Sequence, residues 1–232
     1  MNYFKKYYLS RTKKPFYINK LSDIIGRMTV IIDVGAYHGM FSTEVFSLNN
    51  ICEIHSFEPS PQAFKELKKK YGKNHRIKLN KVAISNICET RTININEYDE
   101  TNSLLESVIT GSNIDSLIKT KSQEIVDITT LDTYIEKNEI KFIDLIKIDS
   151  QGSTYEVLCG LKNALSNRLV DYLYVEVEFI EIYKGQKKFS EVNEHLNQYN
   201  YYIHDVCNLN YLENGQLAWC DILYKKHENQ YI

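Results

Sequence analysis

Residues 29–59 constrain the fold of this chain more than any other stretch. They read TVIIDVGAYHGMFSTEVFSLNNICEIHSFEP and contain two apolar runs, the first followed by Asp33 and the second by Glu58. A turn with two glycines and a segment of helical pattern separate the runs. This order predicts a strand, a tight loop, a helix and a second strand. In units of this kind, ligands bind at the carboxyl ends of the parallel strands, where both acids are expected.

The loop after the first strand carries Gly35 and Gly39, a spacing that narrows the choice of ligand. A glycine directly after a strand permits a sharp turn and lets a ligand approach the backbone closely. The sequence lacks both the G-x-G-x-x-G pattern of dinucleotide sites and the Gly-Lys-Ser/Thr of phosphate-binding loops. An acid before the turn suits a cationic nucleoside without phosphates, and Glu58 is placed to hold both ribose hydroxyls. S-adenosylmethionine is such a ligand; an ordinary strand–turn–helix is the alternative.

Length, charge and cysteine usage limit the remaining possibilities. The 232 residues suffice for an α/β domain with a sizeable core, and the net charge of −2 does not call for a nucleic-acid partner. The odd number of cysteines and the absence of a C-x-x-C pair favour reduced thiols in a cytoplasmic protein. These cysteines are Cys52, Cys88, Cys159, Cys207 and Cys220.

The start of the chain differs in charge from the rest. Residues 1–27 contain seven Lys or Arg residues and one acid, Asp23. We predict a basic helical lead-in over residues 1–28, either solvated or in peripheral contact with an acidic membrane surface. No apolar run approaches the roughly 18 residues that span a bilayer, and residues 1–10 lack the apolar core of a secretory signal.

Strand-like and helix-like segments alternate along the rest of the chain, which predicts an α/β fold in a single domain over 29–232. At its end, strands are expected near 201–206 and 218–224, joined through the hairpin signal Asn214-Gly215. Residues 86–128 stand apart because they are polar and rich in turn signals. We predict that they form a flap on the substrate side; a plain surface insertion is the alternative.

Residues 142–149 form a nearly continuous apolar run, which is typical of a central parallel strand buried on both faces. The run ends in Asp149 and is followed by a turn at Gly152 and a helix expected to reach about residue 165. Lys147 is expected on the face of the strand opposite to Asp149.

Six short motifs occur in order along residues 29–226: Asp33-Val-Gly-Ala-Tyr-His-Gly39, Phe57-Glu-Pro-Ser-Pro61, Thr130-Leu-Asp-Thr133, Lys147-Ile-Asp-Ser-Gln-Gly152, Tyr183-Lys-Gly-Gln186 and Asp221-Ile-Leu-Tyr224. Together they resemble the FkbM family of S-adenosylmethionine-dependent methyltransferases. The resemblance implies a Rossmann-like class I methyltransferase fold, with a seven-stranded, mostly parallel sheet, an antiparallel last strand and helices on both faces. It also implies O-methylation of a sugar hydroxyl in a polysaccharide, glycolipid or nucleotide-sugar precursor.

The resemblance also implies roles for individual residues. The expected cofactor-binding residues are Asp33, Gly35, Ala36, Tyr37, Gly39, Glu58, Pro59, Ala83 and Asp149. From the residues themselves, and not from the resemblance, the expected substrate-binding residues are Ser103, Gln151, Glu178, Tyr183 and Gln186.

Three side chains are candidates for the base that takes the hydroxyl proton: Asp149, Glu176 and His38. We favour Asp149, whose strand should end beside the methyl donor; its alternative role is to orient the cofactor. The alternative role of Glu176 is sugar binding, and the alternative role of His38 is packing. Asp149, Glu176 and Glu178 could converge on Mg²⁺, but without ligand-spaced clusters we expect no metal.

Two other classes of function stay open at this point. One is methylation of a non-sugar acceptor, either RNA or a small molecule. The other is a non-catalytic subunit that binds a nucleoside. An oligomer is also compatible with the sequence.

Overall fold

The computed structural model describes residues 18–112 and 114–228. Its centre is a seven-stranded sheet in the order β3-β2-β1-β7-β8-β10-β9. Neighbouring strands pair in parallel except at β10, which is antiparallel to both β8 and β9. The predicted antiparallel last strand is therefore present, inserted between two earlier strands. The strands are β1 (Val30–Val34), β2 (Glu53–Phe57), β3 (Ile77–Asn80), β7 (Ile143–Ile148), β8 (Val170–Glu178), β9 (Tyr201–Tyr211) and β10 (Leu217–Lys226).

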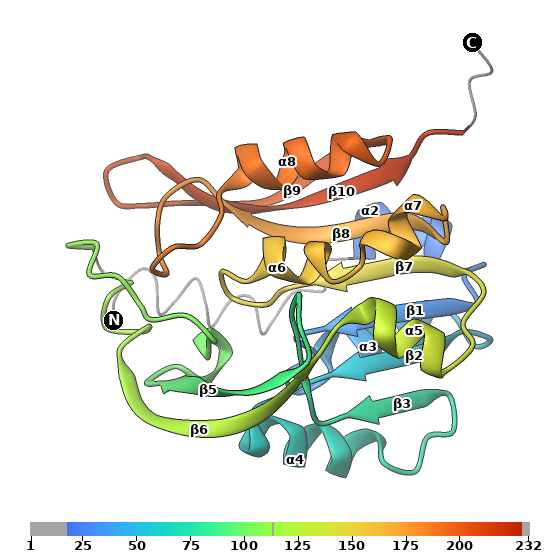
Figure 1. Ribbon diagram of the computed structural model, residues 1–232, viewed down its shortest axis with the longest axis horizontal. Helices are drawn as coiled ribbons and strands as arrows, with labels where there is room; N and C mark the ends of the chain where they lie inside the picture. The colour runs from blue at the N-terminus through green and yellow to red at the C-terminus, as the bar shows by residue number, and fades with distance from the viewer. Residues whose placement is uncertain (1–17, 113, 229–232) are drawn as a thin grey trace.

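Helices cover both faces of this sheet (Figure 1). Ile32 and Ile146 point to the face covered by α5 (Leu131–Lys137), α6 (Thr154–Cys159), α7 (Lys162–Ser166) and α8 (Phe189–Gln198). Ile31 and Leu145 point to the face covered by α2 (Ile18–Ile25), α3 (Met40–Leu48) and α4 (Pro61–Tyr71). Successive strand residues thus pack against helix layers on opposite faces of the sheet, as the strand period of two requires.

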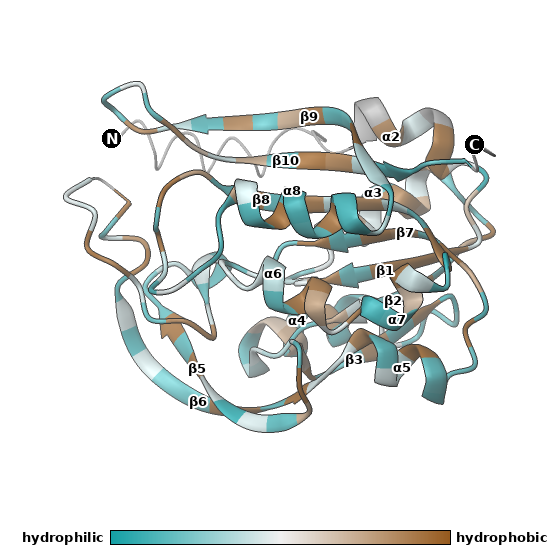
Figure 2. Ribbon diagram, turned by 45° about the horizontal axis from the view of Figure 1, so that its top comes forward, coloured by the Kyte–Doolittle hydropathy of each residue, from teal (hydrophilic) through white to brown (hydrophobic). Residues whose placement is uncertain are grey.

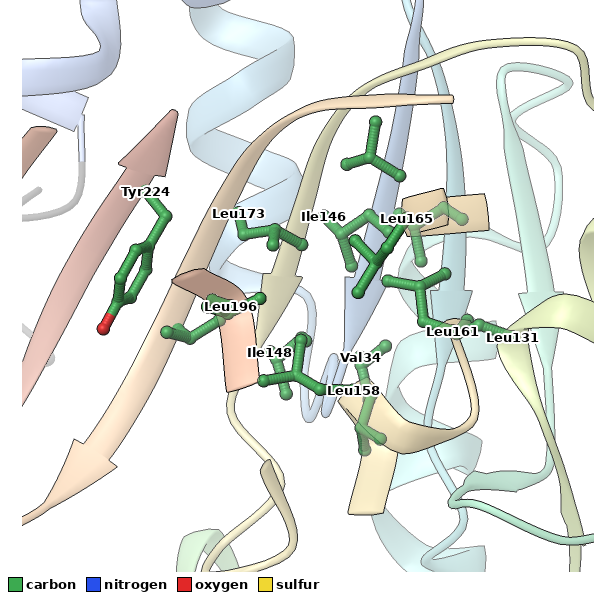
Figure 3. Packing of buried hydrophobic residues seen from close by; sticks show 14 of the residues in the cluster. Val34, Leu131, Ile146, Ile148, Leu158, Leu161, Leu165, Leu173, Leu196 and Tyr224 are labelled. Atoms are coloured by element: carbon green, nitrogen blue, oxygen red, sulfur yellow. The ribbon is translucent and has the colours of Figure 1, made fainter. Parts of the chain in front are cut away.

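The first of these two cores is the larger cluster, and Figure 3 shows its packing. Strand residues such as Ile148 and Leu173 meet helix residues such as Leu158 and Leu196, and all four are at most 1% exposed. Burial of each such side chain contributes about 1.5–3 kcal/mol. Figure 2 shows the matching colour pattern, with hydrophobic strands β7 and β10 inside and hydrophilic surfaces over much of α5 and α8. The nearly unbroken apolar run of β7 is explained by this double coverage.

The predicted flap contains more regular structure than its sequence suggested. A second sheet has the order β4-β6-β5, with β4 (Ala83–Ile84), β5 (Glu89–Asn96) and β6 (Thr120–Thr129). β5 and β6 form a long antiparallel hairpin, and its connection includes the short helix η1 (Asp99–Thr101). Figure 1 shows this hairpin in green at the lower left, on the side toward which the arrows of β1 and β7 point.

Two segments differ from what the sequence suggested. The single helix expected up to about residue 165 is two helices, α6 and α7, separated at Gly160. A Cβ atom on Gly160 would lie 2.1 Å from the carbonyl oxygen of Ser85, so two chain segments come close together there. The predicted lead-in of residues 1–28 lies mostly outside the described residues. In its described part, Leu21 and Ile25 of α2 are buried against the sheet.

The described helices include none that is long and apolar enough to cross a membrane. All five cysteines are free. The boundary at residue 28 and the substrate role of residues 86–128 stay predictions.

Candidate functional site

A cleft of about 1100 Å³, counting its solvent-open mouth, lies at the carboxyl ends of β1, β2 and β7. Its floor comes from the loops after these strands and its cover from the β5–β6 connection. Seven of the nine residues expected to bind the cofactor line it: Gly35, Ala36, Tyr37, Glu58, Pro59, Ala83 and Asp149. Their individual roles as ligands stay predictions, but the topology brings them to one place from four separate segments.

Gly35 lets the loop after β1 pass directly over the end of β7. Its φ is +75°, and a Cβ atom there would lie 1.9 Å from the carbonyl oxygen of Asp149. The loop is also fastened to β2, because the N–H groups of Gly35 and Ala36 both donate to the carbonyl oxygen of Phe57, at 3.1 and 3.0 Å. A residue with a side chain at position 35 would push the two loops apart and reshape the cleft.

Glu58 presents a carboxylate that the backbone holds in a fixed orientation. Its Oε2 accepts a hydrogen bond of 2.8 Å from the N–H of Tyr37, and its Oε1 accepts one of 2.8 Å from the N–H of Ser60. Burial raises the pKa of Glu58 to about 7, although these two hydrogen bonds act in the opposite direction. Each oxygen keeps a further lone pair. The side chain can therefore accept two hydroxyl groups at once from a ligand in the cleft.

Lys147 lies on the same face as Asp149, and the predicted opposite face was wrong. The two residues are two positions apart on the chain, and the strand period of two places them together. The Nζ of Lys147 lies 3.9 Å from Oδ2 of Asp149 and 3.3 Å from Oδ1 of Asp33, and it donates to the carbonyl oxygen of Gly35 at 2.7 Å. Burial alone would lower the pKa of Lys147, but the charges of Asp33 and Asp149 raise it on balance.

Asp33 and Gly39, the other two expected cofactor ligands, do not line the cleft. Asp33 is 0% exposed beneath the loop, where Lys147 is its ionic partner. Gly39 is the N-cap residue of α3. Asp33 therefore acts on the loop indirectly, because it pairs with Lys147 and Lys147 donates to the carbonyl oxygen of Gly35 in that loop.

Asp149 belongs to a hydrogen-bonded chain of side chains. The Nε2 of Gln151 donates to Oδ1 of Asp149 at 2.7 Å and to Oε1 of Glu176 at 3.1 Å. The hydroxyl of Tyr183 donates to Oε1 of Gln151 at 3.0 Å. Gln151 therefore connects the candidate base Asp149, which lines the cleft, with Glu176 and Tyr183, which line a second, smaller cavity. Glu178 lines the same second cavity.

His38, the third candidate base, lines neither cavity. Its ring stacks on Tyr37 with the centroids 3.7 Å apart, and burial lowers its pKa. This position matches the packing role that the sequence left as its alternative.

Two of the expected substrate-binding residues hydrogen-bond to backbone groups of the protein itself. Ser103 donates to the carbonyl oxygen of Gln151 at 2.7 Å and ties the flap to the loop after β7. Gln186 accepts from the N–H groups of Ile182 and Tyr183 and donates to the carbonyl oxygen of Ile180. Both ends of its carboxamide are thus engaged in the loop after β8.

Several residues of these cavities carried no signal in the sequence. Asp99, Glu100 and Leu104 reach the cleft from the β5–β6 connection, and Trp219 reaches the second cavity from β10. Their positions depend on pairing between distant segments, which local spacing does not reveal. Within the described residues, no group of three or more His, Cys, Asp or Glu side chains is arranged to hold a metal ion.

A family model described as the methyltransferase FkbM domain matches residues 33–203 of this chain. The 2-O-methyltransferase NoeI of Sinorhizobium fredii (strain NBRC 101917 / NGR234) is 26% identical over 165 residues, which make up 68% of this chain and 66% of that protein. This chain therefore matches slightly less than two thirds of that relative's length.

Two solved structures share the architecture. TrmK of M. capricolum, solved with S-adenosylhomocysteine, has a TM-score of 0.51 at 13% identity, over 94% of this chain and 72% of that chain. Sp1610 of Streptococcus pneumoniae, a candidate tRNA (m1A22) methyltransferase, has a TM-score of 0.50 at 10% identity, over 93% and 71%. Likeness at such low identity concerns the fold alone, and it confirms the predicted class I methyltransferase architecture.

Proposed function

Because this chain belongs to the methyltransferase FkbM domain family, we propose that it methylates a sugar hydroxyl of a polysaccharide, glycolipid or nucleotide-sugar precursor. The family that six motifs predicted is confirmed, and its cofactor is S-adenosylmethionine. The methyltransferase activity of this chain is inferred from its membership of that family. The oxygen acceptor and the sugar are the proposal. An oxygen acceptor is supported by the 2-O-methyltransferase relative, and a sugar by the family that the motifs resemble.

The cleft fits this cofactor. Glu58 offers two fixed carboxylate oxygens for the ribose hydroxyls. Gly35 has no side chain and therefore leaves space on the floor of the cleft. Apolar side chains, including Ile84 and Leu104, line walls on which the flat adenine can lie. When bound, the cofactor supplies a methyl group activated by its sulfonium.

The observation that carries the proposal is the placement of Asp149. Its side chain is 24% exposed at the end of β7, where Gln151 holds one carboxylate oxygen and Lys147 approaches the other. A carboxylate fixed in this way can accept the proton of an acceptor hydroxyl. A positioned base contributes about 10²–10⁴-fold to a rate, and alignment of the reactants can contribute about 7–11 kcal/mol. Asp149 therefore serves as the base in our proposal.

Glu176 and His38 take other roles in this proposal. Glu176 lines the second cavity and not the cleft, so it is placed for acceptor binding. His38 supports Tyr37 by stacking on its ring. We also propose a cytoplasmic location, because the five free thiols suit a reducing compartment.

The test is transfer of a labelled methyl group from S-adenosylmethionine by the full chain. The acceptors are nucleotide-sugars, neutral, amino and uronic acid glycosides, and, as a separate arm, tRNA. We expect label in at least one sugar, located on oxygen by mass spectrometry of its fragments. Label in tRNA alone would refute the sugar proposal. Tight binding of S-adenosylmethionine with no transfer to any acceptor would favour the non-catalytic alternative.

A further inference from the structure

The amino-terminal ends of the parallel strands form an edge of the sheet opposite to the cofactor cleft. Figure 1 shows these ends on the right, away from the β5–β6 hairpin. Four loops lead into β1, β2, β3 and β7 at this edge, and we call them together the amino edge: residues 26–29, 49–52, 72–76 and 138–142. The amino edge differs from the rest of the chain in charge and in its exposed apolar side chains.

The amino edge is basic, although the whole chain has a net charge of −2. It contains four Lys or Arg residues and one acid, Glu139. The basic residues are Arg27, Lys73, Arg76 and Lys141, and all but Arg76 are exposed. The nearest acids on the strands are engaged, since Glu53 pairs with Lys78 at 2.8 Å and Asp144 accepts from the N–H of Thr29 at 2.7 Å. The edge therefore keeps a positive charge.

Negative charge gathers at the other ends of the same strands. Among the described residues that line the cleft, four are acids and one is basic: Glu58, Asp99, Glu100 and Asp149 against Lys147. The molecule thus has a positive end and a negative end along the strand direction. An anionic surface would attract the amino edge and repel the mouth of the cleft, so it would orient the whole molecule.

Two large apolar side chains lie near the centre of the amino edge. Ile51 is 63% exposed and Phe142 is 40% exposed. The registers that pair β1 with β2 and with β7, continued back to this edge, place the two residues on either side of Met28. Only β1 separates β2 from β7 in the sheet, so the two backbones lie about 10 Å apart. The apolar side chains are therefore close neighbours within a basic surface.

The loop that carries Ile51 is held in place by the buried side chain of Asn49. Its Oδ1 accepts from the N–H of Ile51 at 2.8 Å, and its Nδ2 donates to the carbonyl oxygens of Ile25 and Met28 at 2.6 and 2.8 Å. Leu48 precedes this asparagine at the end of α3 and is 41% exposed. These hydrogen bonds fix the loop to the end of α2 and to the start of β1, and they keep its apolar side chains on the outside.

A bilayer that contains anionic lipids matches both properties of this surface. Apolar side chains enter the boundary between headgroups and acyl chains, while Lys and Arg contact the phosphate groups around them. A nucleic acid would use the basic residues but leave Ile51 and Phe142 in water. A second copy of this chain would bring two basic surfaces together, which repulsion between like charges opposes.

We propose that the amino edge docks on an anionic bilayer, with Leu48, Ile51 and Phe142 inserted among the lipid headgroups. The cofactor cleft then opens away from the bilayer, because it lies at the opposite ends of the same strands. This docking surface is a different part of the molecule from the methyl-transfer site, and it does not depend on which acceptor is methylated.

The test is sedimentation of the full chain with vesicles of phosphatidylcholine alone or with about 30% phosphatidylglycerol. At about 0.05 M salt we expect at least about tenfold stronger binding to the anionic vesicles, and at about 0.5 M salt most of the difference should disappear. Saturating vesicles should leave the affinity for S-adenosylhomocysteine unchanged. Equal binding to both vesicles, binding to neither, or loss of S-adenosylhomocysteine binding on the vesicles would each overturn the proposal.

A pair of substitutions tests the apolar contacts. Ile51→Ser combined with Phe142→Ser should weaken binding to anionic vesicles at least about fivefold. The control combines Ile109→Ser with Ile125→Ser, which removes side chains that are 88% and 79% exposed on the β5–β6 hairpin, and it should bind normally. A thermal shift with S-adenosylhomocysteine shows that each variant is folded. Equal binding by the two variants would contradict insertion at the amino edge.

A second pair tests the charge. Arg27→Gln combined with Lys73→Gln should weaken binding to anionic vesicles at least about tenfold. Lys119→Gln combined with Lys184→Gln removes the same charge from the β5–β6 connection and the loop after β8, and it should change binding less than about twofold. The same loss in both variants would show that only the net charge of the chain matters, and it would overturn a localised docking surface.

Other occupants of the amino edge give different results. Binding to tRNA that is tighter than binding to anionic vesicles, and unaffected by the Ile51 and Phe142 substitutions, would assign the surface to nucleic acid. A dimer in analytical ultracentrifugation that these substitutions abolish would assign it to a second copy of the chain. Either result would replace the bilayer.

Discussion

The Nζ of Lys147 lies 3.3 Å from Oδ1 of Asp33, and both side chains are almost entirely buried. The two residues face each other across the β1–β7 register. From this position Lys147 also donates to the carbonyl oxygen of Gly35 and approaches Asp149. One buried cation thus ties the loop that floors the cleft to the strand that carries the proposed base.

Replacing Lys147 by Met should destabilise the protein by about 3–5 kcal/mol, because Asp33 would keep a buried charge without its partner. Urea unfolding measures the loss. The matched control is Lys121→Met, which removes an ion pair with Asp99 of similar length, 3.1 Å, whose partners are 42% and 39% exposed. That change should cost at most about 1 kcal/mol. Equal losses in the two variants would mean that the buried pair has no special role.

Gly35→Ala should abolish binding of S-adenosylhomocysteine, since the added Cβ would meet the carbonyl oxygen of Asp149 at 1.9 Å. Calorimetric titration measures the affinity. Gly215→Ala is the control, because Gly215 has a similar φ of +83° but no atom within 4 Å of an added Cβ. That variant should lose only about 1–2 kcal/mol of stability from the left-handed backbone and bind normally. Normal binding by Gly35→Ala would disprove the close approach of the two loops.

Cofactor affinity should rise with pH across the pKa of Glu58. That pKa is raised to about 7, so the carboxyl group is largely protonated at pH 6 and ionised at pH 8. Two ribose hydroxyls donate to the ionised form, and binding therefore releases a proton. The affinity for S-adenosylhomocysteine should increase up to about tenfold per pH unit below the pKa and level off above it.

In Glu58→Gln this pH dependence should disappear and the affinity at pH 8 should fall. Glu194→Gln, on the surface of α8, should keep the profile of the unmodified protein. A flat profile in the unmodified protein would argue against a ribose contact at Glu58.

Asp149→Asn should lower the rate of methyl transfer at least about 100-fold while leaving the affinity for S-adenosylhomocysteine nearly unchanged. Single-turnover kinetics with the acceptor found above separates the chemical step from binding. His38→Ala should retain most of the rate, since His38 lines neither cavity. A nearly normal rate for Asp149→Asn, or a large loss for His38→Ala, would reverse the roles assigned to these two residues.

Much of the fold could be read from local patterns. The apolar run of β1, the continuous apolar run of β7 and the Asn214-Gly215 turn each reflect a preference of a few adjacent residues, and the structure has strands and a hairpin there. Positions next to strand ends were equally informative, because a parallel sheet gathers those ends along one edge. Gly35, Glu58 and Asp149 were found in this way, and all three line one cleft.

Helix ends and the flap were harder to predict. The break between α6 and α7 occurs at Gly160, where a distant segment around Ser85 comes within contact distance. The hairpin of β5 and β6 joins segments that look polar and irregular when each is read alone. In both cases the deciding contact is between residues far apart in the chain.

The sequence by itself determined the alternation of strands and helices, the family and the acids at the strand ends, because these depend on short-range spacing along the chain. Only the tertiary structure decided what those acids contact. It buried Asp33 against Lys147, joined Asp149 to Glu176 through Gln151, and set Trp219 beside Glu178. The physical reason is that pairing across a sheet and burial in a cavity bring together residues that are far apart in the sequence. No local sequence pattern records such contacts.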